Sequence, residues 1–139
     1  MNTPTSSTRR NDHGSAAVEV TLATPLLVLL ALAGLAAHHL ISAAMVADSA
    51  AHAAARAATL ERTVPDAQEA ASTAAADVAT QSTATCSTHE VAADLHGLAP
   101  GAVVETTVTC QVDLTVIFGL TLPVTGSGTA VVDRYRGTP

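Results

Sequence analysis

A charge-free run near the start of the chain constrains its fold more than any other feature. No Asp, Glu, Lys or Arg occurs from Val20 to Ala47. A helix that crosses the hydrocarbon core of a bilayer needs about 20 residues, and this run is longer than that. A helix at the surface of a soluble core carries one apolar stripe, whereas the segment LLVLLALAGL is apolar on every side. We therefore expect a transmembrane helix.

Composition excludes several classes of protein. The chain has 139 residues, a net charge of −6, 48% hydrophobic and only 1% aromatic residues. This length allows one small domain with attachments. Without lysine there is no basic patch to neutralise phosphates, so we expect no nucleic-acid partner. Because no GxSxG, P-loop or dinucleotide-binding turn occurs, we expect no enzyme, no cofactor and no small-molecule substrate.

The basic residues before the run predict its orientation. Arg9 and Arg10 lie in the short segment before it, and positive residues beside a span stay in the cytoplasm. Everything after about Ser42 then lies outside, where disulfides persist. The chain has two cysteines, Cys86 and Cys110, with no CxxC motif and no nearby histidine cluster. This pattern predicts one disulfide and no zinc site.

A cleaved signal peptide is the alternative interpretation of the same segment. Secretory signals have an apolar region of about 7–15 residues, which is shorter than this run. Glu19 also stands at the start of the run, and Asn11 and Asp12 follow the twin arginines where a Tat signal prefers apolar residues. We therefore expect the apolar helix to remain on the mature protein.

The residues just before the span carry a resemblance to a known family. They read Gly14-Ser15-Ala16-Ala17-Val18-Glu19, so a basic leader ends in glycine and a glutamate stands fifth after it. This resembles the processing site of Flp-type (class III) prepilins and of TadE-like pseudopilins. The resemblance implies that a prepilin peptidase cuts between Gly14 and Ser15 at the cytoplasmic face. One position departs from the pattern, because Val20 stands where Phe or Tyr is common.

The resemblance extends beyond this motif. The helix-forming segment AAHAAARAATL and the Thr/Val-rich segments TTVTCQVDL and GTAVVDRYR are similar to those of small TadE-like proteins. It implies a structural minor pilin or pseudopilin of the tight-adherence (Flp) pilus. The implied partners are the cytoplasmic membrane, the prepilin peptidase, other Flp/Tad pilins and the assembly platform. It also implies that Glu19 pairs with the N-terminal ammonium of a neighbouring subunit during assembly.

Two helices are expected around the end of the apolar run. The alanine-rich stretch from Ser49 to Leu60 continues the first helix outside the membrane, since alanine is the best helix former. Thr63 and Asp66 have the spacing of a capping box, which predicts a second helix from about Pro65 to Thr80. The acidic and histidine residues of HEVAADLH, residues 89–96, lack the spacing and the number of ligands for a metal site. We expect a solvated helical turn there.

The C-terminal part changes to a period of two. From Val104 to Val116 the even positions are Val, Thr, Cys or Leu, and the odd positions are mostly Thr, Glu, Gln and Asp. Such alternation predicts a half-buried strand with Cys110 on its apolar face, where it could bridge to Cys86. Gly119 and Pro123 are expected to punctuate a connection to a second antiparallel strand from Gly126 to Val132.

These elements predict an α+β fold. It has a long N-terminal transmembrane helix that continues outside the membrane, a second helix and a small antiparallel β-sheet with one disulfide. We expect a cytoplasmic leader over residues 1–14, the helix and its extension over 15–62, and an extracytoplasmic domain over 63–139. Three alternatives stay open: a membrane-anchored or secreted disulfide-stapled binding module, a pseudopilin of another secretion system, and a small membrane enzyme or metal-binding protein.

Overall fold

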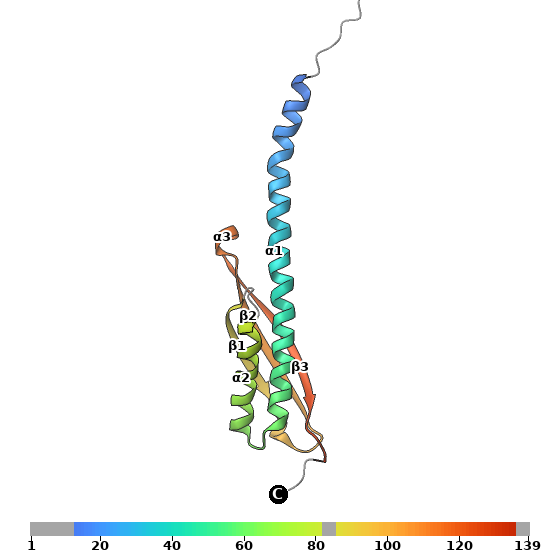
Figure 1. The fold of residues 1–139 in the computed structure, drawn as a ribbon, viewed down its shortest axis with the longest axis vertical. Helices are drawn as coiled ribbons and strands as arrows, with labels where there is room; N and C mark the ends of the chain where they lie inside the picture. The colour runs from blue at the N-terminus through green and yellow to red at the C-terminus, as the bar shows by residue number, and fades with distance from the viewer. Residues whose placement is uncertain (1–12, 82–85, 136–139) are drawn as a thin grey trace, which may run out of the picture. The chain divides into compact units, whose positions relative to one another are not determined.

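The computed structural model describes residues 13–81 and 86–135 of the chain. Its elements are α1 (His13–Leu60), α2 (Val64–Gln81), β1 (Cys86–Asp94), the 3₁₀ helix η1 (His96–Leu98), β2 (Val103–Asp113), α3 (Thr115–Phe118) and β3 (Thr121–Val131) (Figure 1). The chain divides into two compact units, Met1–Leu35 and Ala36–Pro139, which are described separately. The predicted α+β class, with two helices, an antiparallel sheet and one disulfide, is confirmed.

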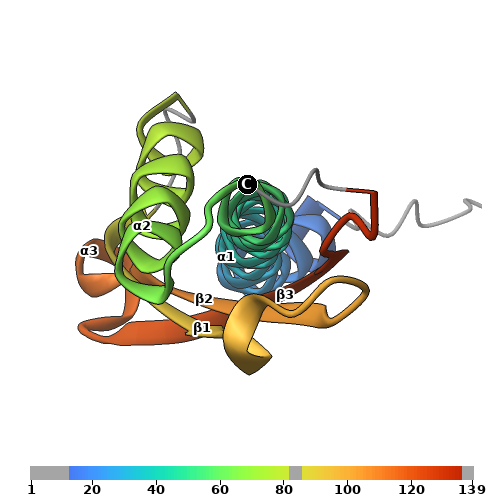
Figure 2. The same cartoon turned by 90° about the horizontal axis from the view of Figure 1, so that it is seen from below.

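The second unit has two layers. Its three strands form an antiparallel sheet in the order β1-β2-β3. The later part of α1 and all of α2 cover one face of this sheet (Figure 2). Buried and more exposed residues alternate along β2. The even-numbered residues from Val104 to Val112 face the helices and are buried. The half-buried strand predicted from the period of two is therefore confirmed.

Alanines form the helix side of the core of this unit, and valines of β2 form much of its sheet side. Seven alanines of α1 have no exposed surface, namely Ala43, Ala47, Ala50, Ala51, Ala54, Ala55 and Ala58. On β3, a Cβ atom at Gly126 would overlap the backbone of Ala47, and one at Gly128 would overlap the backbone of Ala51. Helix and strand therefore touch backbone to backbone, which is possible only because both surfaces carry small residues.

A buried hydroxyl joins the two layers at the same place. The Thr106 side chain on β2 is 2% exposed, and its Oγ1 donates to the carbonyl oxygen of Ala51 at 2.7 Å. The Gly128 carbonyl oxygen lies 3.3 Å from the same hydroxyl. Burying a hydroxyl is costly without such partners, so this polar residue fits an otherwise apolar core.

Helix α2 begins as its sequence predicts. The Asp66 backbone N–H donates to Thr63 Oγ1 at 3.3 Å, and the Thr63 hydroxyl donates to Asp66 Oδ2 at 2.6 Å. These bonds occupy a donor that the first turn of a helix otherwise leaves free. The helix then buries Ala67, Ala71 and Ala75 at a spacing of four residues. The predicted helix and its capping interaction are confirmed.

The expectation of a helical turn in residues 89–96 is wrong. Residues up to Asp94 belong to strand β1, which pairs antiparallel with β2 from Cys86↔Val112 to Asp94↔Glu105. Only Leu95 to Leu98 leave the strand for the turn of η1. Pairing with a central strand outweighs weak local preference, because β-propensity depends strongly on context.

The predicted bounds of the other two strands also need correction. Strand β2 ends at Asp113 instead of Val116, because the Asp113 carboxylate accepts the Thr115 backbone N–H at 2.8 Å and turns the chain into α3. Gly119 ends α3 in the left-handed conformation, with φ of 70°, as a punctuating glycine should. Pro123 does not interrupt the connection but lies inside β3, which an edge strand tolerates.

Candidate functional site

The predicted processing motif lies at the beginning of α1. The helix starts at His13, so Gly14 and Ser15 belong to its first turn. Arg9 and Arg10 of the expected leader lie outside the described residues. Glu19 is exposed and lies beyond the first turn of this helix. The helix dipole stabilises an acidic side chain only within about the first turn. In the uncut chain the dipole therefore stabilises the Glu19 carboxylate little.

The first unit exposes a continuous apolar surface. Between Val18 and Leu35 its large apolar side chains lie in solvent: Val18, Val20, Leu22, Leu26, Leu27, Val28, Leu29, Leu30, Leu32 and Leu35. The most apolar window of this helix has a mean hydropathy of 2.3, and 6% of it is buried. A helix that forms a protein core would be covered by its own fold. This one is not, and it is long and apolar enough to cross a membrane.

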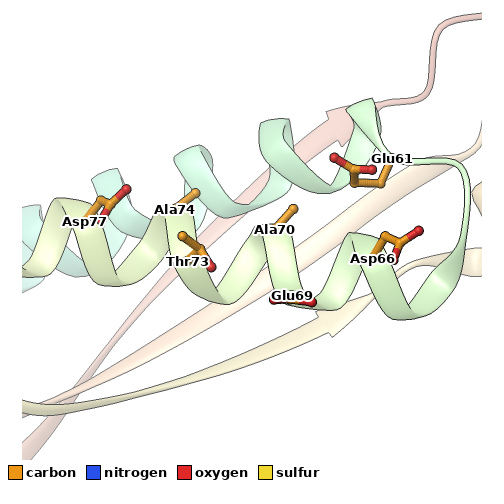
Figure 3. A pocket seen from close by; sticks show the side chains of 7 residues that line it. All are labelled: Glu61, Asp66, Glu69, Ala70, Thr73, Ala74 and Asp77. Carbon is orange, nitrogen blue, oxygen red and sulfur yellow. The ribbon is translucent and has the colours of Figure 1, made fainter.

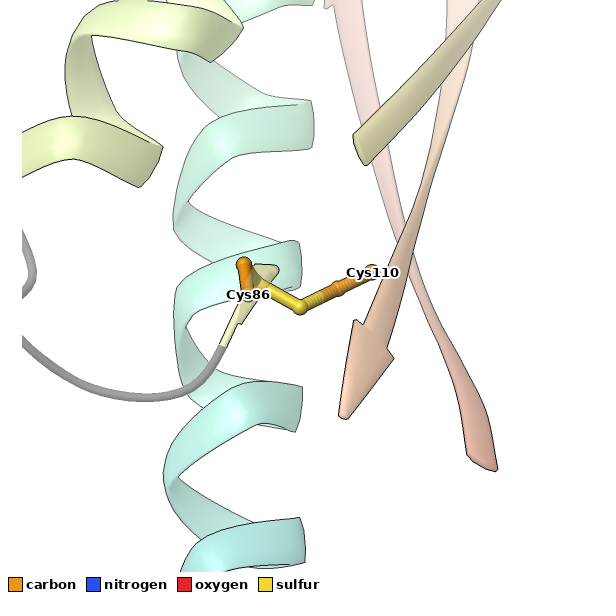
Figure 4. Close-up of a disulfide and its surroundings, with 2 residues drawn as sticks. All are labelled: Cys86 and Cys110. Atoms are coloured by element: carbon orange, nitrogen blue, oxygen red, sulfur yellow. A yellow bond between two sulfur atoms is a disulfide. The ribbon is translucent and has the colours of Figure 1, made fainter. Parts of the chain in front are cut away.

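The two predicted cysteines form the disulfide of the second unit (Figure 4). Their Cα atoms are 5.2 Å apart, and the bond joins the beginning of β1 to β2. Cys110 is fully buried in a cluster with Ala43, Ala47, Val112 and Leu114. The disulfide thus holds the edge strand β1 against the cluster to which α1 contributes Ala43 and Ala47.

An acidic surface extends from the residue after α1 along one side of α2 (Figure 3). Glu61 follows α1, while Asp66, Glu69 and Asp77 come from α2, and together they line a shallow open groove. Sequence reasoning did not single out this surface. The sequence pattern that could have indicated this surface is the recurrence of acidic residues on one side of the amphipathic helix α2.

The acidic and histidine residues of the 89–96 segment are separated by the strand. His89 and Glu90 are neighbours in β1, so their side chains leave opposite faces of the sheet. His96 Nδ1 lies 3.3 Å from Asp94 Oδ1, and both side chains are more than half exposed. Within the described parts of the chain, no three His, Cys, Asp or Glu residues are grouped so as to hold a metal ion.

Comparison with known families concerns the motif and the long helix. The family model for TadE-like protein matches residues 14–56. This segment of the chain is TadE-like. No curated protein and no solved structure gave a match. The resemblance predicted from Gly14 and Glu19 is therefore confirmed for the segment that contains them.

The TadE-like segment covers most of α1. Its first residue is Gly14, and it extends through the exposed leucine-rich part into the alanine-rich part that packs against the sheet.

Proposed function

We propose that this chain is a pilin-like subunit of the Flp pilus apparatus, processed between Gly14 and Ser15 by a prepilin peptidase. The observation that carries the proposal is the coincidence of three features in one segment. The TadE-like match begins at Gly14, a glutamate follows at the fifth position, and an exposed apolar helix comes next. A structural role follows from this arrangement, because the apolar helix is the part available for membrane retention and for packing with other subunits.

The cytoplasmic membrane is the proposed location of the unassembled subunit, with its N-terminus inside. Arg9 and Arg10 favour a cytoplasmic leader by the positive-inside rule. The Cys86–Cys110 disulfide supports the same orientation, because disulfides persist outside the reducing cytoplasm. The three-stranded unit then lies on the extracytoplasmic side and the peptidase acts at the opposite face.

Glu19 is the residue proposed to guide assembly. It is the sole charged residue between Ser15 and Ala47, and it is exposed on α1. Cleavage after Gly14 creates an ammonium group on Ser15. A carboxylate within a bilayer costs several kcal/mol, so Glu19 gains from an ammonium partner supplied by a neighbouring subunit. The pair would also fix the axial register between two apolar helices.

Substitution of Glu19 tests this assignment in cells that make the pilus. Glu19→Gln keeps the side-chain shape and removes the charge, so we expect normal membrane insertion and loss of incorporation into pilus assemblies. Glu19→Asp restores the carboxylate and should recover part of the incorporation. Membrane fractionation and co-purification with sheared pili measure the two steps separately.

A matched control uses another exposed carboxylate. Glu90→Gln alters β1 in the second unit, far along the chain from the motif, and should assemble as the unaltered protein does. Normal incorporation of Glu19→Gln would contradict the proposed role of the carboxylate. Loss of Glu19→Gln from the membrane fraction would contradict it as well, since it would make the residue necessary for insertion.

A further inference from the structure

The connection between β2 and β3, together with the first residues of β3, exposes large apolar side chains. Phe118 is 50% exposed, Leu120 41% and Leu122 38%. The whole segment from Leu114 to Val132 contains no charged residue. We call residues 114–122 the hairpin tip. Loops that face water are normally polar, and a cluster of exposed apolar residues in a loop indicates a surface that meets another apolar phase.

The backbone of the hairpin tip is already hydrogen-bonded within itself. Leu114 N–H donates to the Leu120 carbonyl oxygen at 3.0 Å, and Phe118 N–H donates to the Leu114 carbonyl oxygen at 2.8 Å. Gly119 N–H donates to the Thr115 carbonyl oxygen at 3.0 Å. Unsatisfied backbone groups make it costly to place a loop in lipid. These internal bonds remove much of that cost at the hairpin tip.

Packing within the second unit locates the hairpin tip at one end of that unit. Leu114 is buried with Ala43 and Ala47 of α1, and Leu40 packs against the same cluster. In Figure 1, α3 caps the end of the hairpin that is opposite the end carrying η1 and the α1–α2 turn. The hairpin tip therefore lies at one end of the second unit. The α1 residues at that end are the first ones of this unit, which begins at Ala36.

The proposed span brings lipid to this same end. If the apolar helix enters the bilayer after Glu19, about 20 residues are needed to cross the hydrocarbon core. Counting from Val20, the crossing ends near His39. Leu40 then lies at the outer boundary, and it is Leu40 that packs on the cluster containing Leu114.

We propose that the hairpin tip dips into the outer interface of the cytoplasmic membrane, with Phe118 and Leu120 in contact with lipid. This inference rests on the proposed transmembrane span. It gives the subunit a second, shallow membrane contact in addition to the helix.

Tryptophan fluorescence tests this contact directly, because the chain contains no tryptophan. The full-length Phe118→Trp protein is reconstituted in phosphatidylcholine/phosphatidylglycerol vesicles, with and without bromine atoms on the acyl chains. We expect brominated lipid to remove most of its emission and aqueous iodide to quench it weakly. Tyr135 is 93% exposed, so Tyr135→Trp is the matched control and should show the reverse. Leu120→Trp repeats the test at a second site of the hairpin tip.

A third variant separates failure of this inference from failure of the proposed span. Leu29→Trp places the probe in the leucine-rich part of α1 and should be quenched by brominated lipid. If Leu29→Trp is quenched while Phe118→Trp and Leu120→Trp are not, the hairpin-tip proposal is overturned and the span stands. If Leu29→Trp also escapes quenching, both are overturned.

A neighbouring subunit is the other possible cover for the hairpin tip. In that case Phe118→Trp would be shielded from iodide without being quenched by brominated lipid, and the shielding would disappear as protein is diluted in lipid. That result would overturn the lipid assignment. Blocked thiol labelling of Cys86 and Cys110 in each variant verifies that the second unit has folded.

Discussion

The two halves of α1 differ in which side chains they bury. Between Val18 and Leu35 the large leucine and valine side chains are exposed, whereas from Ala43 to Ala58 seven alanines are fully buried in the second unit. If hydrophobic area alone selected the core, the leucines would be buried first, since burial of a large side chain stabilises more. The burial of alanines instead of leucines follows from the small size of the alanine side chain.

Close approach of two backbones explains this choice. Gly126 and Gly128 let β3 lie directly on α1 at Ala47 and Ala51, where no room remains for a larger side chain. Among the described residues of the first unit, 13–35, the leucine-rich half packs against no such partner. Under the proposed function its apolar surface contacts lipid and other subunits. One helix thus has a half that packs into the second unit and a half that is exposed.

Exchanging the two kinds of residue should have the largest effect. Ala51→Leu forces a large side chain against β3 where Ala51 is 0% exposed, and we expect a loss of about 3 kcal/mol or more, the upper range for overpacked cores. Leu29→Ala removes a side chain that is 64% exposed and should leave the stability of the second unit unchanged. Chemical denaturation of the full chain in detergent, followed by far-UV circular dichroism, measures both. Equal stability of the two variants would contradict the size argument.

Removal of the disulfide should be the next largest effect. Cys86 and Cys110 close a loop with a sequence separation of 24 residues, and such a bond stabilises by about 3 kcal/mol in the chain-entropy model. The paired variant Cys86→Ala/Cys110→Ala should lower the denaturation midpoint of the sheet while α1 from Val18 to Leu35 still inserts into membranes. A variant that keeps its midpoint would show that alanine packing alone holds the second unit.

A methyl group at one glycine gives a finer test. Gly128→Ala places a Cβ atom against the Ala51 backbone, and we expect a cost of about 2 kcal/mol as helix and strand move apart. Gly34→Ala makes the same chemical change in the leucine-rich half, where nothing lies within 4 Å of the added atom. The melting temperature should therefore fall for Gly128→Ala. For Gly34→Ala it should stay the same or rise slightly, because alanine has the better helix propensity.

A hydroxyl-to-methyl exchange separates the halves further. Thr106→Val removes the buried bonds to the Ala51 and Gly128 carbonyl oxygens and should cost about 1 kcal/mol. Thr24 Oγ1 donates at 2.7 Å to the Val20 carbonyl oxygen on the exposed half of α1, so Thr24→Val serves as the control and should not destabilise the sheet. Similar losses in denaturation midpoint for both variants would show that the buried hydroxyl has no special role.

The smallest expected effect is a pH dependence at Asp113, the residue just before the hairpin tip. Hydrogen bonds from the Thr115 hydroxyl and then from its backbone N–H hold the pKa of Asp113 below its ordinary value of 3.8. A lowered pKa in the folded state means that the contribution is complete above pH 3.8 and is lost as the pH falls through the folded-state pKa. The difference in melting temperature between the unaltered protein and Asp113→Asn should therefore shrink below pH 3.8. A constant difference from pH 6 to pH 2 would contradict this linkage.

Much of the fold is predictable from local signals. The exposed helix follows from a run without charge, α2 from the Thr63–Asp66 spacing, and β2 from a period of two. The disulfide follows from a single cysteine pair. The two helices and β2 follow from patterns among neighbouring residues. The disulfide, between cysteines 24 residues apart, follows from the cysteine count alone.

The remaining features depend on pairing in space. Strand β1 has weak alternation of its own and forms because β2 lies beside it. The Gly126 and Gly128 contact requires the register between β3 and α1, which no local pattern contains. The same holds for the Thr106 hydrogen bonds and for the position of Pro123 on an edge strand. At the motif, the residue types and their spacing suffice to predict the roles proposed for Gly14 and Glu19.

The mature N-terminus is the most direct test of the central claim that this is a processed pilin-like subunit. Intact-mass and N-terminal peptide mass spectrometry of the protein, purified from membranes of cells with an active Flp system, identifies its first residue. We predict that this residue is Ser15 and that the apolar helix is retained. A protein that keeps Met1, or one cut beyond Leu35, would contradict it.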